Sequence, residues 1–192
     1  MNAIMESSAI IECFEMHAQA VGAQVQRVAD KKSAIELIVS LLQGEGVDNK
    51  PQCYAVWAHS PLLGPMEEKR LEGEVPGLTF AVTRELAAQA KVGISQMDWA
   101  LADTGSLVDS DDAVDRRLVS TLPPLHIALV ATGALLPDLA SAISRMDPRK
   151  SAYLSFLTGP SRTADIERVL TIGVHGPERL IIVLVDDLGV AA

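Results

Sequence analysis

Apolar positions recur along the chain with two periods, which alternate in the order expected of strands and helices. Helical spacing predicts helices over Ala9–Val21 and Lys31–Gln43, each followed by a glycine. Short apolar runs predict strands, and the two clearest are Leu125–Ala131 and Leu180–Val185. Continuous apolar runs of this length are typical of parallel strands that are buried on both faces.

The remaining segments follow the same two patterns. Further strands are predicted at Gln24–Val28, Cys53–Ala58, Leu78–Val82, Trp99–Val108 and Ala152–Leu157, and further helices at Arg84–Lys91, Asp111–Val119, Pro137–Arg145 and in a run that begins after Pro160 and ends by Gly173. A Pro-, Gly- and charge-rich stretch, His59–Gly77, reads as a loop with room for one short helix. We therefore expect an α/β fold with a mostly parallel sheet flanked by helices, in one domain over residues 1–192.

Composition narrows the function classes. The formal net charge is −9, and no basic cluster offsets it. Binding to nucleic acid or to anionic lipid depends on clustered Lys and Arg, so neither partner is expected. Apolar residues make up 48% of the chain but aromatic ones only 4%, which predicts a core of aliphatic side chains.

The chain has two cysteines, Cys13 and Cys53, and no C-x-x-C motif. Four thiolates for an iron–sulfur cluster or a zinc site are therefore lacking, and no metal site is predicted. Phosphate-loop, dinucleotide-binding and nucleophile-elbow motifs do not occur. No basic leader and no apolar run of the ~20 residues that a membrane helix needs is visible, so we expect a cytoplasmic protein.

A polar corner follows the predicted strand that ends at Leu157. It contains Gly159, Ser161, Arg162, Thr163 and Asp165 at the expected start of a helix. In one interpretation, helix N–H groups, hydroxyls and the guanidinium bind a carboxylate or phosphate. In the other, the same side chains only cap the helix.

Two further turns carry similar residues. Thr104, Gly105 and Ser106 interrupt a strand pattern, and the glycine would let the backbone approach a ligand; the alternative is a simple bulge or tight turn. His175 and Gly176 form a turn before the last strand, where the imidazole either takes part in chemistry or fixes the loop. These residues bind a shared anion only if the turns converge in space.

The corner and its neighbours resemble a known family. Leu157–Glu167 followed by Gly173–Pro177 resembles the hallmark motif of the LUD-domain family, the lactate utilisation protein C group. Ala100–Val108 and Leu122–Ile127 are similar to upstream segments of that family in order and spacing. The resemblance covers about Gly93–Asp186, half of the chain, while residues 1–50 match only as a helical lead-in.

The resemblance implies a fold like that of the NagB/RpiA/CoA-transferase group. It also implies an accessory role in the oxidation of L-lactate to pyruvate, beside iron–sulfur partner subunits that hold the clusters, with no cofactor in this chain. The residues that it suggests for ligand binding are Thr104, Gly105, Ser106, Gly159, Ser161, Arg162, Thr163, Asp165, His175 and Gly176. The sequence leaves open whether the chain is an enzyme. The alternative to the accessory role is a free-standing enzyme or binding protein for a small carboxylated or phosphorylated metabolite.

Overall fold

The computed structural model describes most of the chain. Its described residues are 2–110, 113–145, 153–160, 162–164, 170–172 and 176–188, with the backbone alone for 2–7, 162–164 and 170–172. The predicted site residues Ser161, Asp165 and His175 lie outside the described residues.

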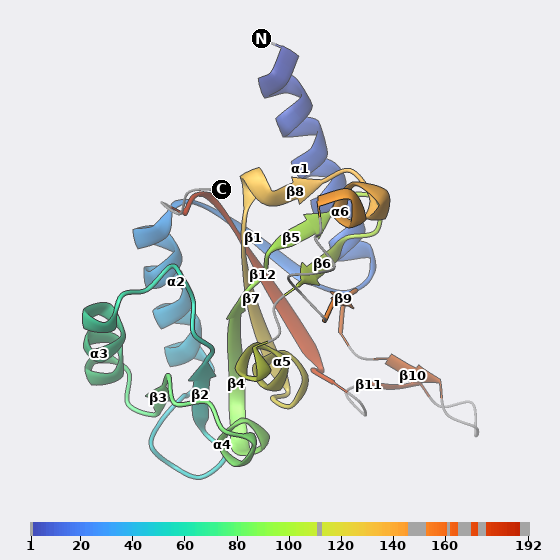
Figure 1. Cartoon of the computed structure of the whole chain (residues 1–192). Coiled ribbons are helices and arrows are strands. Elements are labelled where there is room, and N and C mark those ends of the chain that lie inside the picture. Colours follow the sequence, from blue (N-terminus) through green and yellow to red (C-terminus); the bar gives the residue numbers. More distant parts are fainter. Residues whose placement is uncertain are drawn as a thin grey trace.

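A six-stranded parallel sheet forms the centre of the molecule (Figure 1). In spatial order its strands are β1 (Gln24–Asp30), β12 (Arg179–Asp187), β7 (Leu125–Ala131), β4 (Ala90–Gln96), β2 (Tyr54–Trp57) and β3 (Leu78–Thr79). The central strands β7 and β12 are buried on both faces, which explains their continuous apolar runs. The predicted α/β fold with a mostly parallel sheet flanked by helices is confirmed.

Two helices cover one face of this sheet, α2 (Lys31–Gly44) and α3 (Pro65–Glu74) (Figure 1). Ile38 of α2 and Leu71 of α3 are fully buried in a cluster with strand residues such as Ile127. Apolar residues at helical spacing fix α2 on the sheet, as the sequence predicted, whereas α3 buries Leu71.

Helices α1 (Asn2–Ala20), α4 (Arg84–Gln89) and α5 (Val114–Thr121) lie on the opposite face. Phe14 of α1 packs against Ile182 of β12, and Val119 of α5 packs against Val56 of β2. The sheet thus has a helical layer on each side, and its two strand-end edges are left for loops.

A second, four-stranded sheet packs beside α1. Its spatial order is β8 (Leu135–Leu136), β5 (Trp99–Leu101), β6 (Ser106–Asp109) and β9 (Ser155–Leu157). A short 3-10 helix, η1 (Thr132–Ala134), precedes β8, and α6 (Leu139–Arg145) covers the outer face. Strands β5 and β6 form an antiparallel hairpin, so the interruption predicted within Trp99–Val108 is its turn.

The helix predicted after Pro160 is wrong. Arg162–Ala164 forms β10 and Leu170–Ile172 forms β11, and the two pair antiparallel with Thr163 opposite Thr171. Polar residues that begin a helix also occur at turns, and cross-strand pairing decides between the two structures here. The described part of the corner is therefore not a helix N-terminus, and the helix dipole does not support an anion there.

One central strand escapes the sequence pattern. β4 (Ala90–Gln96) follows directly on α4, whereas the sequence predicted a helix to Lys91 and no strand. Gly93 and Ser95 interrupt its apolar run on the face toward α5, so only Val92 and Ile94 resemble a strand core. The predicted helix at Asp111–Val119 begins later among the described residues, at Val114.

A fully buried histidine lies on this same face. His126 of β7 is 0% exposed, and its Nε2 lies 2.8 Å from the Ser95 hydroxyl on β4. Burial lowers the pKa of His126 from 6.5 to about 3. The imidazole is therefore neutral at physiological pH and is a structural part of the core.

This burial predicts an acid-dependent loss of stability. Above pH 6.5 the imidazole is neutral in both the folded and the unfolded chain. As pH falls from 6.5 toward 3, only the unfolded chain gains the proton, so the free energy of unfolding should fall by about 1.4 kcal/mol per pH unit from this group. Urea unfolding at pH 5 and pH 7 measures the difference, which His126→Asn should reduce by about 2 kcal/mol.

The matched control is His59→Asn, because the His59 side chain is 78% exposed. That variant should keep the pH difference of the parent chain. If His126→Asn also keeps the full difference, the imidazole does not titrate as its burial requires.

Candidate functional site

The turn between β5 and β6 packs against the end of α1. Gly105 has φ +66°, and a Cβ there would lie 2.3 Å from the backbone N of Ala18. The Ser106 hydroxyl donates to Thr104 Oγ1 at 2.8 Å and lies 2.7 Å from Thr158 Oγ1. The glycine thus lets the turn approach a helix backbone, and the hydroxyls bond to one another.

Gly159 lies beside the same helix end. Its φ is +72°, and a Cβ would lie 2.6 Å from the carbonyl oxygen of Val21. Because β6 pairs with β9, the structure brings Thr104–Ser106 next to Thr158 and Gly159. The Thr104–Ser106 turn therefore meets the start of the corner, at Thr158 and Gly159, beside the end of α1. Its meeting with Ser161–Thr163, and ligand binding by these residues, stay predictions.

The other predicted residues that the structure describes come before β12 in the chain. Arg162 and Thr163 are in β10, and Gly176 comes shortly before β12. The first residues of β12 meet the start of β7 there, where the Glu178 and Arg179 N–H groups both donate to the Pro124 carbonyl. This is the edge of the sheet opposite to the one at which ligands of open α/β folds bind.

A cavity of about 580 Å³ lies at the carboxyl ends of β4, β7 and β12, and we name it the carboxyl-edge cavity. Its lining includes Gln96, Asp98, Trp99, Ser110, Arg145 and Asp186. The size is typical of small-molecule sites. From β2 the chain continues to β3 on one side of the sheet, and from β4 it continues to β7 on the other side. The connections therefore change direction between β2 and β4, close to the cavity, and many ligand sites of this architecture lie at such a change of direction.

A buried guanidinium fixes one wall of the carboxyl-edge cavity. The Arg116 side chain on α5 is 9% exposed, and its Nη2 lies 3.3 Å from both Asp98 Oδ1 and Asp109 Oδ1. It also donates to the Gln96 carbonyl. Asp109 is almost completely buried, so Arg116 compensates a carboxylate that would be costly alone.

Asp98 and Ser110 face each other across the base of the β5–β6 hairpin. The Asp98 Oδ2 accepts from the Ser110 N–H at 2.8 Å and from its hydroxyl at 2.9 Å. On the neighbouring strand end, the Ser60 hydroxyl donates to Gln96 Oε1 at 2.5 Å. Polar groups of the wall are therefore held in fixed orientations, as a preorganised binding site requires.

Charged groups on the rim differ in their partners. Asp186 accepts from Arg27 Nε at 2.8 Å, and this hydrogen bond raises the pKa of the guanidinium. Among the described residues, no carboxylate is recorded within ion-pair distance of Arg145, which is exposed at the end of α6. Arg145 is thus the one cation in the described lining, against the three aspartates Asp98, Asp186 and Asp187.

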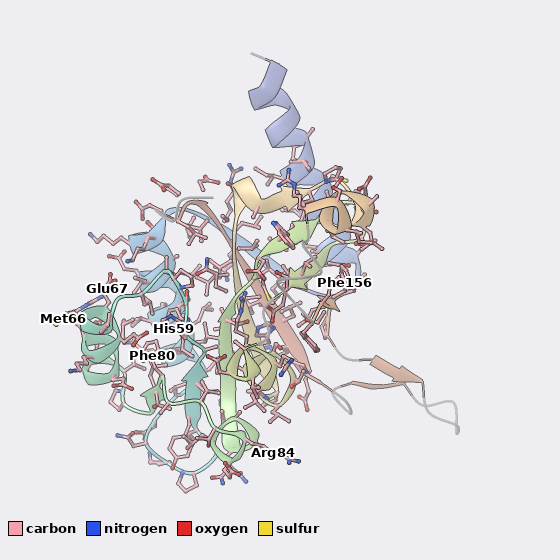
Figure 2. The ribbon with its side chains drawn as sticks, viewed as in Figure 1. His59, Met66, Glu67, Phe80, Arg84 and Phe156 are labelled. Carbon is pink, nitrogen blue, oxygen red and sulfur yellow. The ribbon has the colours of Figure 1, made fainter. Side chains whose placement is uncertain are left out.

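A second hollow, of about 660 Å³, runs between α2 and α3, with Met66 and Glu67 of α3 on the side of the molecule away from Phe156 of β9 (Figure 2). Glu67 accepts from Lys31 at 2.8 Å, which lowers its pKa, and Arg70 pairs with Glu74. These charges already pair within the groove, and most of its lining belongs to two helices. The carboxyl-edge cavity is the stronger candidate site.

Across the described residues, no three potential metal-ligating side chains gather at one place. Cys13 lies on α1 near His17, and Cys53 lies just before β2. The expectation that iron–sulfur clusters belong to partner proteins stays a prediction. None of the helices within the described ranges combines the length and apolar character that a membrane crossing needs.

Sequence reasoning missed the polar residues of the carboxyl-edge cavity. Gln96 and Asp98 can be placed only once β4 is known, and nothing in the local sequence indicates that Arg116 contacts Asp98. The usable signal was Gln96 and Asp98 directly after a buried run, because polar residues at the carboxyl ends of parallel strands often form sites.

Comparison with known proteins identifies the family. Residues 11–185 match the sequence profile of the LUD domain. This match covers most of the chain, so the chain belongs to the LUD-domain family, and the resemblance of the motif is confirmed.

Curated relatives share one name. The chain is 38% identical over 109 residues to "Lactate utilization protein C 1" of Bacillus mycoides, which covers 54% of this chain and 47% of that protein. It is 37% identical over 112 residues to "Lactate utilization protein C" of an Exiguobacterium species, covering 55% and 49%. A longer match, at 24% over 199 residues, covers 97% of this chain and 82% of the protein of the same name from Bacillus pumilus. The matches to the first two relatives thus span about half of their length.

One solved structure is similar over nearly the whole chain. It is the crystal structure of a DUF162-family protein from Deinococcus radiodurans, with a TM-score of 0.55 and 19% identity over 93% of this chain and 98% of that one. At this identity the likeness supports the fold and carries no inference about function.

Proposed function

We propose that the chain supports lactate utilisation, as an accessory protein in the oxidation of L-lactate to pyruvate beside iron–sulfur partner proteins. The observation that carries this proposal is its similarity to relatives named lactate utilization protein C, at 38% and 37% identity. The two cysteines lie on separate elements, and a chain without clustered thiolates is suited to a role in which partners hold the clusters.

Deletion of the gene tests this role. The deletion strain should lose growth on L-lactate as sole carbon source and keep growth on pyruvate, because the block lies before pyruvate. A tagged full-length chain should co-purify with a cysteine-rich iron–sulfur protein from lactate-grown cells. Normal growth on lactate, together with no such partner, would refute the proposal.

The second candidate function is the binding of a small metabolite, as an enzyme or as a binding protein. The carboxyl-edge cavity favours it, because Asp98 and Ser110 of its lining are hydrogen-bonded to each other, and Asp98 also to Arg116, before any ligand arrives. Sites with a few oriented polar groups in a largely apolar hollow are typical of metabolite binding. The two candidates are compatible, since a lactate-utilisation protein can respond to a metabolite.

A further inference from the structure

We propose that the carboxyl-edge cavity binds a neutral, hydroxyl-bearing small molecule with a flat apolar ring, the chemistry of a ribonucleoside. Asp98 would accept a hydroxyl hydrogen of this ligand. The inference rests on the second candidate function, because it names the ligand class of the same cavity. This ligand is neutral, unlike the carboxylate or phosphate that the sequence suggested for the turns at the other edge of the sheet.

Asp98 has acceptor capacity left for a ligand. A carboxylate offers about four lone-pair positions. The Ser110 N–H and hydroxyl occupy two of them, and the Arg116 guanidinium occupies a third. The side chain is 30% exposed and lines the cavity, so the remaining position is open to a donor such as a hydroxyl group.

Charge disfavours an anion beside this wall. Asp98 and Asp109 both lie 3.3 Å from the guanidinium of Arg116, and these three side chains together carry a formal charge of −1. Of the other charged side chains in the described lining, Asp186 pairs with Arg27, and Asp187 and Arg145 carry one charge of each sign. A phosphate or carboxylate next to Asp98 would meet like charge and could donate no hydrogen bond at neutral pH.

The rest of the described lining is suited to an apolar ring. Met97, Trp99, Ala134 and Leu188 contribute apolar surface to the cavity. Asp98 and Trp99 both line the cavity, so a hydroxyl acceptor and an aromatic side chain belong to the same described lining. Indole faces favour contact with flat rings, and a cavity of about 580 Å³ has room for a nucleoside.

Titration of the full-length chain with adenosine tests the proposal. Isothermal calorimetry and heteronuclear NMR should show saturable binding, with shifts at Asp98, Trp99 and Ser110. The compound 2′,3′-dideoxyadenosine should bind about ten-fold more weakly or worse, since it lacks the hydroxyls that donate to a charged acceptor. Adenosine 5′-monophosphate should gain no affinity over adenosine, because the wall is acidic.

Two variants test whether Asp98 is the residue that accepts the ligand's hydroxyl hydrogen. Asp98→Asn keeps the size of the side chain and removes its charge, and it should abolish most of the preference for adenosine over the dideoxy compound. The matched control is Asp103→Asn, because Asp103 is an exposed aspartate in the turn at the far end of the same hairpin. That control should bind both compounds as the parent chain does. The comparison of ligands on the parent chain needs no variant to fold.

The outcomes separate this inference from the function on which it rests. Equal binding of adenosine and its dideoxy analogue, or tighter binding of the monophosphate within the cavity, overturns the hydroxyl acceptor and leaves metabolite binding in place. If adenosine fails and a panel of carboxylates and phosphates also leaves the cavity resonances unshifted, both ideas fail. Growth on lactate reports on neither of these results.

Discussion

Gly93→Ala should destabilise the chain by about 3 kcal/mol or more. A Cβ at this position would lie 2.0 Å from the carbonyl oxygen of Val119 and 2.9 Å from Pro123 Cγ. The first clash is with the backbone of α5, which no side-chain rotation can relieve. The free energy of unfolding in urea, measured at pH 7, checks this value.

The matched control is Gly73→Ala. Gly73 lies within α3, and a Cβ there would have no atom within 4 Å. Alanine in an exposed helix stabilises by about 0.5–1 kcal/mol relative to glycine. A Gly93→Ala variant as stable as the parent would mean that α5 does not sit directly on β4.

Arg116→Met should cost about 3–5 kcal/mol of folding free energy. The substitution keeps much of the side-chain volume and removes the guanidinium, so Asp109, which is 1% exposed, loses a cationic partner in the interior. The cost should therefore come from a stranded carboxylate rather than from lost packing. Urea unfolding of the variant measures it.

Two comparisons isolate that cause. Arg116→Met combined with Asp109→Leu should recover at least half of the loss, because the buried carboxylate is then removed together with the guanidinium, and Asp98 is partly exposed. Arg117→Met, at the next position of α5, removes a guanidinium 4.4 Å from the Tyr153 ring and should cost only about 0.5–1 kcal/mol. A double variant no more stable than Arg116→Met would contradict the electrostatic explanation.

The sequence predicted those helices and strands whose buried residues form an uninterrupted apolar or helical pattern. Leu125–Ala131 agrees with β7 at both ends, because nearly every one of its side chains is buried. The helix at Lys31–Gln43 agrees within one residue, because Asp30 caps its start by accepting from the Ser33 N–H. The local sequence is enough to predict a helix or strand when the residues of that element alone indicate where it begins and ends.

Long-range pairing explains what the sequence did not reveal. Gly93 and Ser95 resemble loop residues until the close approach of α5 to β4 is known. The segment after Pro160 resembles a helix start in sequence, and only the pairing of Arg162–Ala164 with Leu170–Ile172 shows that these described residues form strands. Arg116 and Asp98 are 18 residues apart, and nothing in either local sequence indicates that they meet. The contact between Ser106 and Thr158, and the packing of both turns against the end of α1, likewise depend on long-range pairing that the local sequence does not show.

The shared direction of the six main strands gives the molecule two chemically unlike poles. The described turns at Thr104–Ser106 and Thr158–Gly159 lie beside the end of α1 that leads into the start of β1, whereas the carboxyl-edge cavity lies at the opposite ends of the strands. Substitutions in the lining of the cavity can therefore accumulate without disturbing the packing of these turns.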